Sequence, residues 1–275
     1  MNQTQKIIKY FAIALAIFLI ISIFSILILG ITRVTSVFYP EITNNMDINK
    51  EEYREITIEK NISNLEIDLS NTNLIIKNSS IFKIETNNQY VNIKQNIKHI
   101  HINETKHRYH VKDYSYDLII YIPDNYIFNY VNIDAGAGRI DIESLNSNKV
   151  SFSLGAGKAT INNLNITDEM ELESGVGEII INSSNLNDLE LDIGVGNFEL
   201  NAILTGKNEI NSGIGKVTIN LLNSINNYNI ITDSGIGSVK VNNNKINNSS
   251  SYGTGPNLIK IDNGIGEIEI TTLEN

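Results

Sequence analysis

The sequence predicts an all-β fold, a β-solenoid of about seven glycine-containing rungs plus irregular early rungs, preceded by one N-terminal transmembrane helix. Three observations predict it: a pair of glycines recurs seven times, apolar residues alternate along short segments, and a long uncharged stretch lies near the N-terminus. Because the chain has no cysteine, neither disulfides nor thiolate metal sites stabilise it.

The N-terminal stretch from Tyr10 to Ile31 has no charged residue and matches the roughly 20 residues that cross a bilayer core as a helix. A cleaved signal peptide is the alternative, although its apolar region usually has about 7–15 residues and no A-x-A-like site follows here. Lys6 and Lys9 precede the stretch and only Arg33 follows closely, so we expect a cytoplasmic N-terminus and an extracellular C-terminal domain.

These boundaries give a cell-membrane protein with a single span. We expect a cytoplasmic tail at 1–9, a transmembrane helix at 10–32 with the lipid bilayer as its partner, a tether at 33–50 and an extracellular domain at 51–275. All 31 acidic residues lie beyond residue 37, against 21 basic residues in the whole chain. This acidic domain argues against nucleic acid or anionic lipid as its partner.

The glycine pairs are the repeat signal. They are Gly136 and Gly138, Gly155 and Gly157, Gly175 and Gly177, Gly194 and Gly196, Gly213 and Gly215, Gly235 and Gly237, and Gly264 and Gly266. Successive pairs lie 19, 20, 19, 19, 22 and 29 residues apart. Each pair opens a unit of the form G-x-G-x-h-x-h, where h is an apolar residue. A nearly constant period of this kind predicts stacked units that bury a continuous column together.

The phase of the apolar residues predicts what the glycines do. Apolar residues alternate at Leu189, Leu191, Ile193 and Val195 and resume, one residue out of phase, at Phe198 and Leu200. An extra residue that keeps both runs facing inward predicts a corner or bulge, where glycine adopts positive φ without steric cost. We expect the residue between the two glycines to point into the same interior.

The repeats occupy 134–275, and the segments around them are less regular. Residues 51–133 keep the strand pattern without glycine pairs, which predicts irregular rungs that cap the stack; a separate small β-domain is the alternative. The polar segment 242–257 predicts a loop out of the stack, and the short acidic last rung predicts a protected edge.

The run "YDLIIYIPDNYIFNYVNIDAGAGRIDIESL", with the glycine units behind a transmembrane segment, resembles the putative-adhesin β-strand-repeat family, the LiaG-like bacterial surface proteins. The resemblance covers roughly 51–275 and includes the strand that ends in Ile122 and Pro123. It implies a solenoid-like extracytoplasmic domain, associated in this family with cell-envelope stress modules, and it supplies no catalytic residues.

Two ligand classes that glycine repeats can bind are disfavoured. A phosphate loop runs from a strand into a helix N-terminus, whereas every glycine pair here runs into another strand pattern, and Lys158 is replaced by Glu178 or Asn197 in equivalent units. Calcium-binding repeats need an aspartate two residues after the last glycine, where this chain has only apolar residues.

Carboxylates on neighbouring rungs raise the question of an enzyme. Some β-helices cleave acidic polysaccharides with clustered carboxylates, and outward positions here hold Asp141, Glu143, Glu171, Glu173, Glu190 and Asp192. Outward acidic residues are the normal solvated face of a strand, and no nucleophile or base motif accompanies them. We therefore expect no enzymatic activity and no cofactor.

Residues 99–116 hold the strongest candidate for binding chemistry. All four histidines lie here: His99, His101, His107 and His110. Exposed, unliganded histidines are the commoner explanation of such a cluster, and a zinc site formed by the four is the alternative. The candidates for partner contacts are Tyr109, Tyr114, Tyr116 and Tyr252, although core packing is the favoured role for tyrosines in this region.

The sequence thus predicts a non-enzymatic, membrane-anchored surface or envelope protein, adhesin-like or accessory to envelope-stress sensing. Its expected partner is a cell-envelope protein or glycan. The alternative is an extracellular metal- or glycan-binding domain that uses the His- and Tyr-rich segment 99–116.

Overall fold

A computed structural model describes residues 52–58, 61–105, 116–246 and 250–273. The described residues belong to one compact unit, Lys50–Asn275. The predicted tail, membrane helix and tether lie outside the described residues. Within the described ranges, no helix is long and apolar enough to cross a bilayer, and the only helical element is the 3-10 turn η1 (Ile225–Asn227).

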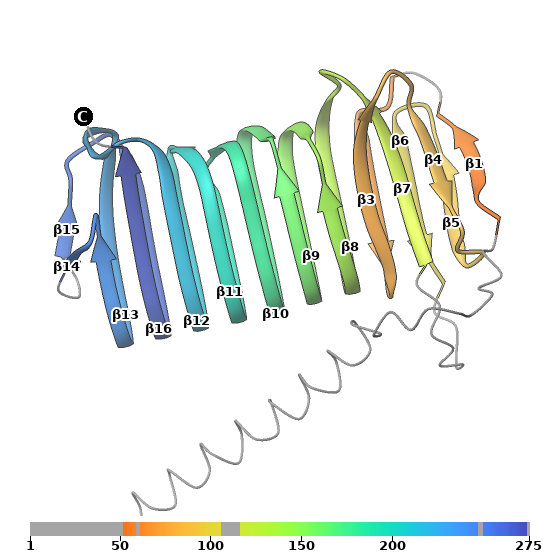
Figure 1. The fold of residues 1–275 in the computed structure, drawn as a ribbon. Helices are drawn as coiled ribbons and strands as arrows, with labels where there is room; N and C mark the ends of the chain where they lie inside the picture. Colours follow the sequence, from red (N-terminus) through yellow and green to blue (C-terminus); the bar gives the residue numbers. More distant parts are fainter. Residues whose placement is uncertain (1–51, 59–60, 106–115, 247–249, 274–275) are drawn as a thin grey trace, which may run out of the picture. The chain divides into compact units, whose positions relative to one another are not determined.

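Seven long strands form the repeat body, each of which contains one glycine pair. They are β8 (Ile127–Ile142), β9 (Leu145–Asn162), β10 (Leu164–Asn187), β11 (Leu189–Thr205), β12 (Lys207–Ser224), β13 (Tyr228–Val241) and β16 (Asn257–Leu273). Neighbours pair in parallel with the glycine pairs in register, for example Gly177 with Gly196 and Gly196 with Gly215. Each strand bends back at its glycines, so the stack has two walls around one core (Figure 1). The predicted solenoid-like, all-β fold is confirmed.

The core confirms the predicted change of phase at the corner. In β11 the buried residues are Leu189, Leu191 and Ile193 before the glycines and Phe198, Leu200, Ala202 and Leu204 after them. Each wall alternates with period two, as a half-buried strand does, and the five-residue step across the corner keeps both walls facing inward.

The residue between the glycines does not point inward, contrary to the prediction. Val176 is 36% exposed, Ile265 41% and Ile236 70%, and the corresponding residues of the other corners are half-buried. The chain reverses direction at the corner, so the alternation of the two walls does not continue through this residue. The residues between the glycines therefore form an apolar ridge along the outside of the corners. In the order of the sheet they are Ala137, Ala156, Val176, Val195, Ile214, Ile265 and Ile236.

Glycine is required at the corners for two different reasons. At Gly196 the backbone has φ +152°, which L side chains rarely adopt, and an added Cβ would lie 1.8 Å from the carbonyl oxygen of Gly177 in the neighbouring rung. Gly194 has no such φ, yet an added Cβ there would lie 2.4 Å from the carbonyl oxygen of Gly175. The prediction of positive φ thus holds for the second glycine of this pair, whereas the first is required by close backbone approach.

The last rung is not the edge of the stack, contrary to the prediction. Strand β16 inserts between β12 and β13 and pairs in parallel with both (Figure 1). After β12 the chain passes through η1 and leaves one strand position of the sheet empty before β13. The last strand, β16, then occupies this position. Within 242–257, β14 (Asn244–Ile246) and β15 (Ser250–Tyr252) pair antiparallel with β13 and cover the actual edge.

The segment before the repeats continues the same stack. Its strands are β1 (Arg54–Thr57), β2 (Asn64–Leu69), β3 (Thr72–Ser79), β4 (Lys83–Thr86), β5 (Val91–Gln95), β6 (His99–Glu104) and β7 (Tyr116–Pro123). Strands β2 and β3 extend the two walls of β8 in parallel, and β6 and β7 extend them by one more position. Strands β5 and β4 then add antiparallel to each wall, with β1 beyond β4, so the sheet direction changes at this end.

A ladder of asparagine amides joins the rungs on the wall after the corners. The Nδ2 group of each asparagine donates to the Oδ1 atom of the preceding rung: Asn182 to Asn162 at 3.1 Å, Asn201 to Asn182 at 2.9 Å, and Asn220 to Asn201 at 2.6 Å. Such a ladder forms only when identical side chains stack in register, so it supports the parallel alignment.

We expect Gly194→Ala to lower the free energy of unfolding by about 2 kcal/mol through overpacking, and Gly196→Ala by about 3 kcal/mol, since it adds backbone strain. Urea unfolding of the purified protein measures both. Val195→Ala, on the ridge between them, serves as the control and should cost less than about 1 kcal/mol because its side chain is half-buried. If Gly194→Ala unfolds like the parent protein, close approach does not determine the corner.

Asn201→Asp should destabilise the protein by about 1 kcal/mol at pH 7, because the new carboxylate oxygen would face the Oδ1 acceptor of Asn182. Asn197→Asp in the same strand is the matched control, since residue 197 lies outside the ladder and stands in register between Glu178 and Lys216. Equal urea midpoints for the two variants would contradict a structural role of the ladder.

Candidate functional site

The wall before the corners carries two outward rows of acidic side chains. Glu171, Glu190 and Glu209 stand in register in one row, and Glu173 and Asp192 stand in register in the other. They alternate with buried residues such as Leu172 and Leu191, and this alternation turns them to solvent. We call this surface the acidic face; it comprises Glu171, Glu173, Glu190, Asp192 and Glu209, with Asp134, Asp233 and Asp262 on the flanking rungs.

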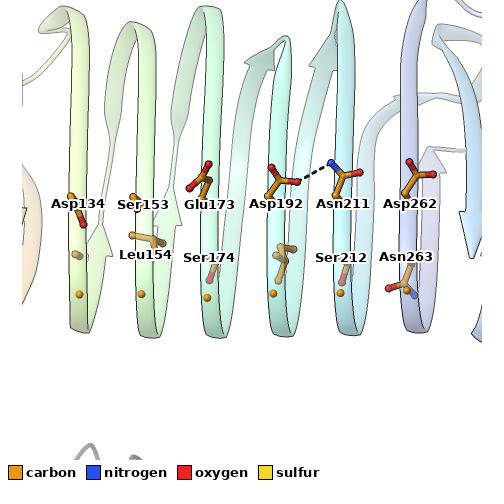
Figure 2. Close-up of a pocket in the computed structure, with 18 of the residues that line it drawn as sticks. Asp134, Ser153, Leu154, Glu173, Ser174, Asp192, Asn211, Ser212, Asp262 and Asn263 are labelled. Carbon is orange, nitrogen blue, oxygen red and sulfur yellow. Dashed lines mark hydrogen bonds between the residues drawn. The ribbon is translucent and has the colours of Figure 1, made fainter. Parts of the chain in front are cut away.

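An open groove of about 1010 Å³ runs across the rungs beside the corners. Figure 2 shows its repeated lining, in which successive rungs place a polar residue at the same position: Asp134, Ser153, Glu173, Asp192, Asn211 and Asp262. The first glycine of each pair also lines it, since a residue without a side chain leaves the backbone open. Asn211 Nδ2 donates to Asp192 Oδ1 at 2.8 Å, which orients both side chains (Figure 2). The lining has acceptors and amides but no basic side chain.

The charges of the acidic face are largely uncompensated. Among the described residues, Glu171, Glu173, Glu190 and Asp192 form no ion pair, and Lys260 contacts only the margin, at Glu209 (3.1 Å) and Asp262 (3.0 Å). Partial burial is the largest of the effects that raise the pKa of Glu190. The negative charges of its neighbours also raise it; they are Asp192, Glu171, Glu209 and Glu169. The face is therefore a region of concentrated negative charge that the fold itself does not neutralise.

The opposite wall shows that stacking alone does not produce this imbalance. There Lys158 pairs with Glu178 at 2.7 Å, and Lys216 pairs with Glu269 at 2.6 Å. The lysine hydrogen bonds lower the pKa of Glu269, the reverse of the effect on Glu190. Asp141, which the sequence grouped with the acidic row, belongs to this wall and pairs with Arg139 at 2.6 Å.

Two of the four histidines of the predicted cluster lie within the described residues. His99 and His101 lie on one face of β6, as the alternation predicts, and both contact Glu66 of β2. His107 and His110 lie outside the described residues. Glu66 was missed by the sequence analysis: the alternation in "NLEIDL" turns it outward, but nothing in the sequence reveals that β2 pairs with β6.

The tyrosines predicted to contact partners divide similarly. Tyr109 and Tyr114 lie outside the described residues, and Tyr116 is half-buried at the start of β7. Tyr252 on β15 packs against the hydrophobic core, which favours the core-packing alternative for this residue. Tyr130 on β8 was not singled out, yet 42% of it is exposed.

Comparison with solved structures finds chains that are similar to this one. A "putative adhesin" from Bacteroides fragilis is 14% identical, with a TM-score of 0.52 over 81% of this chain and 98% of its own. A "putative adhesin" from Parabacteroides distasonis is 13% identical, with a TM-score of 0.47 over 80% of this chain and 96% of its own. No match is found among curated proteins.

The family model for Toastrack DUF4097 matches residues 43–257, which is most of the chain and includes both the early strands and six of the seven glycine corners. The predicted adhesin-type, solenoid-like family is confirmed in this form, and the narrower LiaG-like assignment stays a prediction. By this match the chain belongs to the Toastrack DUF4097 family.

Proposed function

We propose that the protein is a non-enzymatic, adhesin-like component of the cell surface that binds a positively charged partner through the acidic face. The observation that carries the proposal is the contrast between the two walls: after the corners, lysines pair with Glu178 and Glu269, whereas before them four stacked carboxylates form no ion pair among the described residues. The Bacteroides fragilis neighbour, named a "putative adhesin", supports the adhesin-like class.

The electrostatics of Glu190 support a binding role. Burial is the first cause of the raised pKa of Glu190, and repulsion by the neighbouring carboxylates is the second. Like charges held in register in this way oppose folding. A surface that lowers stability and forms no internal pair is typical of binding sites, where the missing countercharge comes from a partner. The groove beside the face gives such a partner a continuous contact over several rungs.

The location is part of the proposal and rests on the sequence. A transmembrane helix at 10–32 with a cytoplasmic N-terminus would present residues 51–275 outside the cell, where envelope proteins and glycans are accessible. An accessory role in envelope-stress sensing is the narrower form of this proposal, and it rests on the family resemblance.

The proposal is tested by a pull-down of envelope fractions with the full-length protein in detergent. The triple variant Glu173→Gln, Glu190→Gln and Asp192→Asn removes three charges from the acidic face. We expect it to bind its envelope partner about tenfold less tightly, and binding by the parent to fall between about 0.05 M and about 0.5 M NaCl.

The matched control removes three charges from the other wall: Glu178→Gln, Glu199→Gln and Glu267→Gln. It has the same net charge as the first variant, so it separates a specific face from overall charge. Equal loss in both variants, or binding that does not respond to salt, would reject the acidic face as the contact surface.

The charge penalty itself predicts a pH dependence. A carboxyl whose pKa is raised by folding binds its proton more tightly in the folded state, so the penalty is full above the raised pKa and absent below the ordinary value of 4.5. Glu190→Gln should therefore be more stable than the parent at pH 7, and the difference should vanish near about pH 3.5. Urea unfolding at the two pH values measures it. Glu169→Gln, which breaks the 2.9 Å pair with Lys149, should show no gain at pH 7.

A further inference from the structure

We propose that Glu66, His99 and His101 form a binding site for a divalent transition-metal ion such as Zn²⁺. The three side chains come from two neighbouring strands, β2 and β6, and each offers one ligand atom. These atoms all lie within 4.8 Å of one another. The site goes beyond the proposed adhesin-like function and does not depend on it.

The geometry converges on one carboxylate oxygen. Glu66 Oε2 lies 3.1 Å from His99 Nε2 and 3.1 Å from His101 Nδ1. In tetrahedral zinc sites the metal–ligand distance of about 2.0–2.1 Å separates neighbouring ligand atoms by about 3.3 Å. The two spacings in the protein are therefore close to those of a tetrahedron's edges, and the third, between the two histidine nitrogens, is at most 4.8 Å.

The backbone around the site is held firmly. Asn64 pairs with His99 and Glu66 with His101 in the parallel register of β2 and β6. The residues that alternate with them, Leu65 and Ile100, have no exposed surface, so the core anchors both strands from below. Strand β8 pairs with the other edge of β2, and β5 with the other edge of β6. Ligands on paired central strands are preorganised better than ligands on loops.

The charges around the site admit a cation. Lys94 of β5 stands opposite His101 in the register, but it forms no ion pair with Glu66 among the described residues. On the other side, β8 places Asn132 beside Glu66. Asp68 lies two residues along β2 and stands opposite Asp134 of β8, which adds negative charge. In the part of the chain that the structure describes, the two imidazoles are the only ion-pair partners of Glu66.

The donor set indicates the class of ion. Imidazole nitrogens with one carboxylate oxygen suit Zn²⁺ and its late first-row neighbours, whereas Ca²⁺ and Mg²⁺ prefer oxygen ligands alone. The side chains of Glu66, His99 and His101 are 41%, 38% and 36% exposed. An ion can therefore enter from solvent, and a fourth position stays open to water or to a group from a partner.

Zinc titration of the full-length protein in detergent, measured by isothermal calorimetry after chelator treatment, tests the site. We expect one tight Zn²⁺ site that raises the thermal unfolding midpoint. Glu66→Gln keeps the shape of the side chain and should weaken Zn²⁺ binding by at least about tenfold and abolish the zinc-dependent rise of the midpoint. His101→Gln should do the same.

Two controls make the outcome decisive. Without zinc, both variants should unfold close to the parent, since all three side chains are more than a third exposed and none belongs to the hydrophobic core. A variant that fails this test is replaced by His99→Gln. The double variant His107→Ala and His110→Ala should retain the tight site, as should Glu171→Gln on the acidic face. Undiminished zinc binding in both Glu66→Gln and His101→Gln, or loss in the His107 and His110 variant, would overturn the assignment.

Discussion

The close approach of backbone at the glycine corners is the constraint on which the rest of the structure depends. At Gly196 and Gly215 an added Cβ would lie less than 2 Å from the carbonyl oxygen of the neighbouring rung, so no other residue fits without moving a rung. The corners consequently stack directly over one another, and a slip of one residue would place a side chain where none can be accommodated. Register in this repeat is determined at the bend, and both walls follow from it.

Exact register converts similar sequences into rows of similar chemistry. Asparagines at one position become a hydrogen-bonded ladder, as Asn182 and Asn201 show, and carboxylates at another become a line of repelling charges, as at Glu190. The first arrangement stabilises the stack, whereas the second opposes it. The two walls share one stacking geometry, yet among the described residues lysines stand beside Glu178 and Glu269 on one wall and form no ion pair with Glu171 or Glu190 on the other. This difference in charge is therefore determined by the side chains on each wall, because the stacking geometry itself does not require it.

The sequence predicted what is periodic and missed what depends on pairing. The phase change at Ile193 and Phe198 reveals the bend because burial acts along one strand. The outward ridge at Val195 was missed because alternation assumes a straight strand, which fails where the chain reverses. The insertion of β16 between β12 and β13 was missed for another reason: all rungs carry the same glycine pattern, so the pattern does not encode their order. Glu66 has the same difficulty, since its partners lie more than thirty residues away on a strand with no glycine pair.

The proposed metal site and the acidic face belong to one wall of the stack. Register carries a single row from His101 through Glu66, Asn132 and Ser151 to Glu171. A bound divalent ion would place positive charge at one end of this row, while the carboxylates keep the other end negative. A partner that reaches along the row could then bind the metal ion at its open coordination position and place its own positive charge on the carboxylates of the same surface. Because parallel stacking aligns these positions, the early strands contribute more than a cap: they place a different kind of ligand in line with the repeats.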